Sequence, residues 1–453
     1  MSQPFLVHRR DWLATAGALA CSALATSPVL AAPKKRPRVA AIYTELRFRS
    51  HAYNILENFF LPYMFCGELV DPGCEVVSLY ADQFPQDDMT REASQRLKVP
   101  LFKTIDEALC VGGKSLDVDA VLLIGEHGDY PYNAMGQHLY PRKPFFDQIV
   151  RTMQRSGRFV PLFNDKHLSY RWDWAKEMYD VARENKMPMQ AGSSVPLGER
   201  RPNWELPADA EVEEVVSIHG GGMEVYDFHG LELLESIVEA RKGGETGVAS
   251  VETFTDDKLK KAMEEGLWSP ALFSAAMQAE REIGVSRQQR PPLSIRPGVV
   301  PPDKSLKVAH AVRVTYRDGM KATVLKVGGD SARWNFACRL KGDSQPHATA
   351  IYNGPWGNRC LFKALSHAIQ HMFITGQEPY PLERTLLTTG ITEAIMKAHA
   401  AGKPLETPHL NIAYQAVDFR SFRENGASWK LITPETKQPE TFDPGDEKLL
   451  GKR

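Results

Sequence analysis

Hydrophobic and polar positions follow two different patterns along the chain, and the change falls near residue 192. Before it, short apolar runs are separated by stretches that have the 3.6-residue period of a helix. Strands are predicted at residues 38–43, 75–80, 118–124 and 159–163, and helices at 52–65, 90–97, 144–156 and 172–185. Apolar strands that alternate with helices are typical of a parallel sheet covered on both faces. Residues 37–192 are therefore predicted to form a doubly wound, Rossmann-like α/β domain.

After residue 192 the strands pair with their neighbours in sequence. Two apolar runs, 306–316 and 321–327, flank Arg317-Asp318-Gly319, which is a hairpin turn signal. Further strands are predicted at 332–340 and 347–352, and helices at 227–239, 256–265, 361–374 and 382–399. This pattern predicts an α+β domain with an open, largely antiparallel sheet over residues 193–433. Residues 288–302 are predicted to be a proline-rich loop, and residues 434–453 a flexible tail.

Residues 1–32 have the pattern of an export leader. Arg9-Arg10 precedes an Ala- and Leu-rich run, and residues 29–32 offer the small side chains that signal peptidase needs. Paired arginines at this place indicate the twin-arginine route, so we expect a periplasmic protein. An uncleaved membrane anchor is the alternative. The weak apolar character of the alanines, serines and threonines favours cleavage, and no later segment is apolar enough to span a bilayer.

Composition narrows the function classes further. The net charge is -1 and 25% of residues are charged, so no basic field favours nucleic-acid binding. Six cysteines, one of them in the leader, form no CxxC motif, and buried free thiols are expected, with a Cys66–Cys74 bridge as the alternative. The histidines and acidic residues match no metal-motif spacing, since even His367 and His371 lack an intervening glutamate, and no metal is predicted.

Three local patterns accompany this order of elements. Asp165-Lys166 follows the strand at 159–163, the glycine run 220–222 leads to His229 and Glu232, and Asp82 follows the second strand. With these patterns the chain resembles the Gfo/Idh/MocA oxidoreductases, which carry Glu-Lys-Pro and His-x-x-Asp at the corresponding places. Members of that family oxidise or reduce sugars and polyols with NAD(P). The resemblance covers nearly the whole chain after the leader in its order of elements.

The resemblance implies a chemistry for the chain. It implies hydride transfer between a sugar or polyol and tightly bound NAD or NADP. Lys166 and His229 would transfer the proton, and Asp165 and Glu232 are the acidic residues of the same catalytic group. A catalytically silent carbohydrate-binding protein and an NAD-dependent glycosidase on the same fold are the alternatives. The C-terminal sheet offers a face for a homo-oligomer, and the expected partner is a small sugar or polyol.

The first βα turn departs from the family. A Rossmann domain carries GxGxxG here, because glycines let the backbone approach the pyrophosphate. Residues 43–51 contain no glycine, and Glu45 would repel a phosphate. Arg47 and Arg49 could grip phosphates directly instead. The predicted cofactor contacts are therefore Thr44, Arg47, Arg49 and Asp82, with Glu126 and His127 near the nicotinamide.

Two polar loops follow the strand at 118–124. They span residues 125–131 and 136–142, and the next strand leads into His167. Since loops at the carboxyl ends of parallel strands face the ligand crevice, His138, Arg142 and His167 are predicted to contact the substrate. A loop held together by turns and Tyr/Pro packing is the alternative for this cluster.

Overall fold

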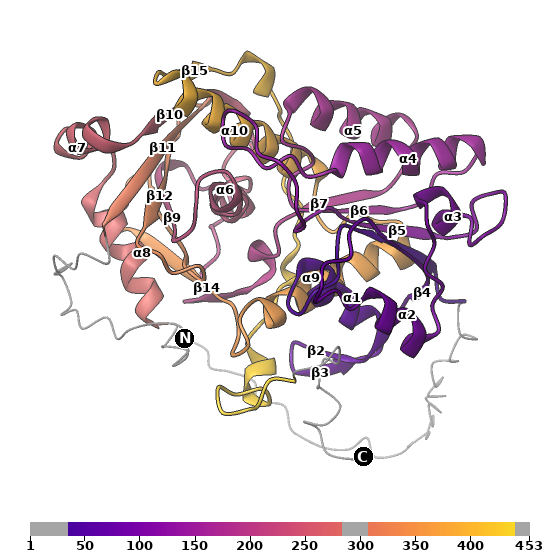
Figure 1. Cartoon of the computed structure of the whole chain (residues 1–453). Helices are drawn as coiled ribbons and strands as arrows, with labels where there is room; N and C mark the ends of the chain where they lie inside the picture. Colours follow the sequence, from indigo (N-terminus) through magenta and orange to yellow (C-terminus); the bar gives the residue numbers. More distant parts are fainter. Residues whose placement is uncertain (1–34, 283–306, 440–453) are drawn as a thin grey trace, which may run out of the picture. The chain divides into compact units, whose positions relative to one another are not determined.

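The computed structural model describes residues 35–282 and 307–439, and within them two large β-sheets organise the fold (Figure 1). The leader 1–32, the loop 288–302 and residues 440–453 of the predicted tail lie outside the described residues. From Arg36 onward the described residues form one compact unit. No helix in this part of the chain has the length and apolar character needed to cross a bilayer.

The first sheet has five parallel strands in the order β4-β1-β5-β6-β7. In chain order the strands are β1 (Arg38–Tyr43), β4 (Glu75–Ala81), β5 (Ala120–Ile124), β6 (Leu162–Asp165) and β7 (Met189–Gly192). The connecting helices are α1 (His51–Phe60), α2 (Thr90–Leu97), α3 (Ile105–Leu109), α4 (Arg142–Arg155) and α5 (Trp172–Glu184). Successive residues of β1 point to opposite faces, so Ala41 packs in the layer of α1 and Ile42 in the layer of α4. The predicted doubly wound domain is confirmed.

The helix predicted over residues 52–65 was wrong in its last part. Helix α1 ends at Phe60, and Leu61 is extended with φ −133° and ψ 152°. The cause is Pro62, because a proline disfavours helical backbone at the residue before it. The next residues form β2 (Tyr63–Phe65), which pairs antiparallel with β3 (Glu68–Val70).

The second sheet has eight strands in the order β15-β10-β11-β12-β9-β13-β14-β8. All neighbouring strands run antiparallel except β9 and β12, which are parallel. The predicted open, largely antiparallel sheet is therefore confirmed. Its strands are β8 (Glu199–Arg201), β9 (Val212–His219), β10 (Val248–Phe254), β11 (Val308–Tyr316), β12 (Lys321–Val327), β13 (Trp334–Leu340), β14 (His347–Tyr352) and β15 (Leu405–Glu406).

Helices cover both faces of the second sheet. Val215 packs in the layer of α6 (Val225–Val238) and α10 (Leu382–Ala401), while its neighbour Val216 packs against α7 (Asp256–Glu264) and α8 (Pro270–Glu282). This alternation is the two-residue period of a strand. The sheet face opposite α6 thus carries helices of its own chain, and association of copies through this sheet stays a prediction.

The last long helices connect the two sheets. Helix α9 (Asn358–Thr375) follows the second sheet in sequence but packs beside α1 of the first (Figure 1). Arg359 Nη2 lies 2.7 Å from Glu57 Oε2 in a fully buried ion pair between these helices. Helix α10 likewise contacts α5. Tertiary contacts therefore cross residue 192, and the domain boundary there stays a prediction.

The five cysteines of the described chain carry free thiols. Burial raises the pKa of the Cys66 thiol to about 11 and that of Cys74 to about 12. Both thiols are therefore protonated at neutral pH, and the predicted free thiols are confirmed.

Candidate active site

Residues from both sheets meet at one small cavity. Its free volume is about 10 Å³, and it is lined by Glu126, His138, Tyr140, Lys166, His167, Glu224 and Val225. Glu126 follows β5 and Lys166 follows β6, at the carboxyl ends of parallel strands, where α/β folds bind ligands. Glu224 and Val225 come from the start of α6 on the second sheet. The structure thus places the loops predicted to face the crevice around a shared space.

A buried ionic cluster forms one wall of this cavity. Lys166 Nζ lies 2.8 Å from Glu126 Oε1, and Arg142 pairs with the other carboxylate oxygen. Burial alone would raise the pKa of Glu126, but the charges of Lys166 and Arg142 hold that pKa well below its usual range. Arg142 also donates from Nε to the Asp165 carbonyl at 3.2 Å. Arg142, predicted to contact substrate, is thus committed to neighbouring protein groups.

Three residues of the site adopt a left-handed backbone. The φ angles are 63° at Lys166, 72° at His127 and 65° at Glu224. Such backbone costs a non-glycine residue about 1–3 kcal/mol and collects at functional sites. At Lys166 it is held by two hydrogen bonds with Gly192 of β7, at 3.2 and 3.0 Å. The left-handed backbone therefore lowers the stability of the folded state at the residues whose side chains it orients in the site.

His229 on α6 is held by a serine that the sequence analysis missed. Its Nδ1 lies 2.6 Å from Ser193 Oγ, and the Ser193 N–H donates to Glu232 Oε2 at 3.1 Å. Burial and the charge of Lys166 hold the pKa of His229 well below its usual range, so the ring is neutral. Glu232 is fully buried, and neither His229 nor Glu232 is among the residues that line the cavity. Glu232 positions the serine and, through it, the imidazole.

The first βα turn brings a further imidazole to the site. His51, the first residue of α1, places Nδ1 2.6 Å from Asp165 Oδ2. Its ring meets that of His127 edge-on, with centroids 5.0 Å apart. Burial and then His51 lower the pKa of His127 to about 3, and His127 Nε2 has no hydrogen-bond partner among the described residues. The only sequence signal for His51 was its place at the end of the turn that lacks glycine.

The residues predicted to contact substrate lie on the same side of the cavity. The His138 ring lies between Tyr132 and Tyr140, with ring centroids at 4.2 and 3.9 Å. His167 also lines the cavity, and burial together with the charge of Arg142 holds its pKa well below the usual range. His138 Nε2 lies 2.9 Å from the Tyr130 carbonyl oxygen and His167 Nε2 lies 3.4 Å from Arg142 Nη1, so both rings contact protein groups, and their contact with substrate stays a prediction.

Glu224 is a site residue for which the sequence analysis proposed no catalytic role. Its side chain is buried, and Oε2 accepts the His138 N–H at 3.1 Å. The other oxygen, Oε1, has no hydrogen-bond partner among the described residues. Burial raises the pKa of Glu224 to about 7. This carboxyl can therefore give or take a proton near neutral pH.

Protein side chains fill the turn in which a dinucleotide would normally rest. Leu46 is 1% exposed within the core, and Glu45 is 3% exposed. Thr44 Oγ1 donates to the Glu126 carbonyl at 2.6 Å. The charge of Arg47 is taken up by an ion pair with Glu45, and Arg49 Nη2 donates to the Trp356 carbonyl at 2.8 Å. The Arg47 charge is thus compensated within the turn, and one donor of Arg49 is engaged by the protein.

The acid predicted to bind the ribose is also engaged. Asp82 accepts the hydroxyl protons of Tyr80 at 3.0 Å and Tyr130 at 2.6 Å. The buried Glu45 carboxylate after β1 opposes a diphosphate, and the two tyrosine hydroxyls occupy acceptor sites of the aspartate expected to hold the ribose. The residues present therefore do not fit NAD or NADP in the usual Rossmann pose.

One group within residues 35–282 and 307–439 has the ligand types and spacing for a metal ion: His219, Asp227 and His310. His219 Nε2 lies 2.7 Å from Asp227 Oδ1, and His310 Nε2 lies 3.0 Å from the same oxygen. His219 Nδ1 accepts the Gly221 N–H at 3.3 Å, which leaves its proton on Nε2 to donate to Asp227. Hydrogen bonds alone account for this cluster.

Comparison with known proteins identifies the fold. No protein-family model and no curated protein matches the sequence. GenD2 from gentamicin A biosynthesis, solved in complex with NAD, matches with a TM-score of 0.51 at 12% identity, over 83% of this chain and 97% of that chain. Myo-inositol 2-dehydrogenase from Lactobacillus plantarum matches with 0.48 at 11% identity, over 82% and 99%. Scyllo-inositol dehydrogenase from Lactobacillus casei, with NAD(H) and scyllo-inositol bound, matches with 0.47 at 11%, over 82% and 99%.

Proposed function

We propose that the chain, which has the fold of the Gfo/Idh/MocA oxidoreductases, is an enzyme that acts on a hydroxyl group of a sugar or polyol at the cavity. One observation carries this proposal: the Lys166–Glu126 ion pair of the first sheet and the Glu224 carboxyl of the second line the same space.

These groups have complementary roles. The Lys166 ammonium stabilises negative charge on a hydroxyl oxygen as its proton leaves. Glu224, with a pKa of about 7, exchanges that proton near neutral pH. The neutral His229 ring, held by Ser193, is the second group for proton transfer.

The fuller form of the proposal is an exported oxidoreductase that uses NAD or NADP. Its support is the leader with Arg9-Arg10 and the fold shared with GenD2. Against the cofactor stands the filled first turn, in which Glu45 and Leu46 are buried. That same observation favours a second candidate, which is a protein that binds a carbohydrate, or transfers protons to and from it, without a nicotinamide.

The two candidates differ in what the folded protein carries. Small molecules released from purified protein are measured by mass spectrometry and absorbance. Recovery of NAD or NADP, or saturable binding of either in calorimetry, supports the oxidoreductase. Absence of both removes the hydride acceptor and leaves the second candidate.

The catalytic role is tested with Lys166→Met. On a competent sugar, loss of the ammonium should lower kcat by about two to four orders of magnitude, the usual reach of acid–base catalysis. Lys143→Met is the matched control, because Lys143 is similarly buried and ion-paired to Asp147 at 2.7 Å on α4. Equal turnover of the two folded variants would contradict the proposed role of Lys166.

A further inference from the structure

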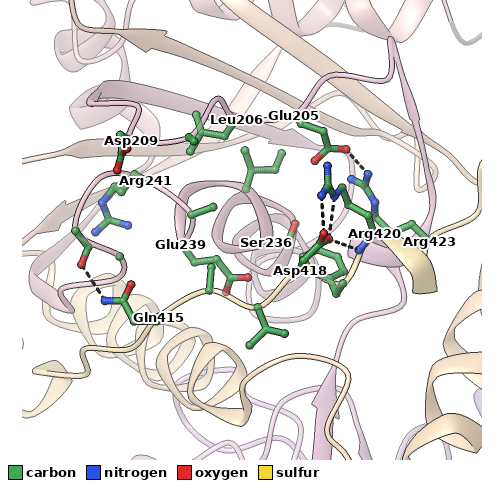
Figure 2. Close-up of a pocket in the computed structure, with 18 of the residues that line it drawn as sticks. Glu205, Leu206, Asp209, Ser236, Glu239, Arg241, Gln415, Asp418, Arg420 and Arg423 are labelled. Atoms are coloured by element: carbon green, nitrogen blue, oxygen red, sulfur yellow. Dashed lines mark hydrogen bonds and ion pairs between the residues drawn. The ribbon is translucent and has the colours of Figure 1, made fainter.

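A second, larger cavity lies at the other end of α6. It has a volume of about 520 Å³ and is formed by the end of α6, residues 205–209 and residues 415–423 (Figure 2). Helix α6 has 14 residues, so about 20 Å of helix separates this cavity from Glu224. The cavity is thus distinct from the candidate active site, and a ligand bound in it would not depend on the proposed function.

Two buried arginines at this cavity share one carboxylate. Arg200 Nη1 lies 2.9 Å from Glu205 Oε2, and Arg423 pairs with Glu205 Oε1. The neighbouring Arg420 already forms its own pair with Asp418 within the same segment (Figure 2). Glu205 is therefore shared by two guanidinium groups, and the other acids of the cavity lining are Asp209, Glu239 and Asp418.

The same two arginines have unused donors. Arg200 is 4% exposed and Arg423 is 8% exposed. Arg200 Nε, and both Nε and Nη1 of Arg423, are buried without a hydrogen-bond partner among the described residues. Buried donors of this kind each cost about 1–3 kcal/mol. Burial and then the nearby charge of Arg423 also lower the pKa of Arg200 to about 9.

We propose that this cavity binds a small molecule through one carboxylate, which is held by Arg423 and Arg200. The two oxygens of a carboxylate match the paired N–H groups of a guanidinium. Arg423 is bound to Glu205 only through Nη2, so its remaining N–H groups can turn towards the ligand.

The rest of the lining selects the class of ligand. Asp209 also lines the cavity, and its negative charge disfavours a phosphate dianion more than a monoanion. Leu206, Ile237 and Val417 offer apolar surface to the body of the ligand. A monocarboxylate with a carbon skeleton, such as a sugar acid, fits this lining.

Thermal denaturation and calorimetry test the proposal on the folded protein. The probes are sodium acetate, sodium glucuronate and sodium phosphate, each against sodium chloride at equal ionic strength. We expect saturable binding of the carboxylates with a rise in Tm, and tighter binding of glucuronate than of acetate if the ligand is a sugar acid. Tighter binding of phosphate, or no saturable binding of any carboxylate, overturns the proposal.

Variants locate the binding in the cavity. Arg423→Met should weaken carboxylate binding at least tenfold, whereas Glu205→Gln should strengthen it because a competing carboxylate is removed. Arg420→Met is the matched control, since Arg420 is exposed in the same segment and paired with Asp418. Should Arg423→Met fail to fold, the opposite sign expected for Glu205→Gln still decides. Unchanged binding in the variant of either contact residue contradicts the assignment.

Discussion

Glu224 illustrates how one buried side chain can set the chemistry of a site. It precedes α6 with a φ of 65°, and its carboxyl receives only one protein hydrogen bond, from the His138 N–H. Burial disfavours the charged form of a carboxyl, so the pKa rises from the ordinary value of 4.5 to about 7. Glu126, also buried, has its pKa held low because Lys166 and Arg142 contact it. The two carboxyls of one cavity thus have different protonation states.

This difference predicts the pH dependence of Glu224→Gln. A raised pKa in the folded state means that Glu224 contributes stability below pH 4.5 and loses it as the pH rises through about 7. Glutamine stays neutral, so the variant should match the wild type near pH 4.5 and exceed its unfolding free energy by up to about 3 kcal/mol at pH 8. Urea denaturation across this pH range measures the difference. A constant difference between the two proteins would contradict the raised pKa.

At the scale of elements, the end of β7 shows how closely the first sheet packs against helices α6 and α10. Gly192 has a φ of 119°, and a Cβ placed on it would lie 2.5 Å from Glu232 Oε2 of α6 and 2.7 Å from Thr385 Oγ1 of α10. These three elements meet where Ser193 turns towards His229. A side chain at residue 192 would push apart the groups that position the imidazole.

Gly192→Ala should therefore destabilise the protein through both backbone strain and a steric clash. We expect a loss of about 3 kcal/mol, of which the left-handed backbone accounts for about 1–2 kcal/mol. Gly157→Ala is the matched control, because Gly157 has a φ of 64° and open space at its Cβ. Chemical denaturation of both variants gives the comparison. Equal losses would mean that the contact with Glu232 and Thr385 relaxes freely.

At the scale of the whole molecule, the proposed export depends on the predicted leader. The twin-arginine route requires Arg9 and Arg10 themselves, so changing both to lysine should stop export while the rest of the chain folds normally. Fractionation of cells that express the wild type or the double variant measures this. Changing Lys34 and Lys35 to arginine is the control, which should be exported as before. Periplasmic accumulation of the variant in which Arg9 and Arg10 are lysine would contradict the proposed route.

The sequence by itself determined the order of elements and part of the candidate site. The period of the hydrophobic residues depends only on residues that are close in sequence, so it can be read without the fold. It correctly indicated a parallel sheet followed by a largely antiparallel one. The rule that loops leave parallel strands at a common edge placed Glu126 and Lys166 together, and they form an ion pair. The absence of glycine from residues 43–51 also signalled a changed cofactor turn.

Only the tertiary structure decided which distant residues complete the site. His51 reaches Asp165 over 114 residues, and His138 reaches Glu224 over 86. The same packing turned Arg49 to the Trp356 carbonyl, 307 residues away, where the sequence had predicted a phosphate contact. Local propensities act over a few residues, whereas these contacts exist because the apolar faces of both sheets are buried against shared helices. That burial brings Glu224 of the second sheet to the lysine of the first.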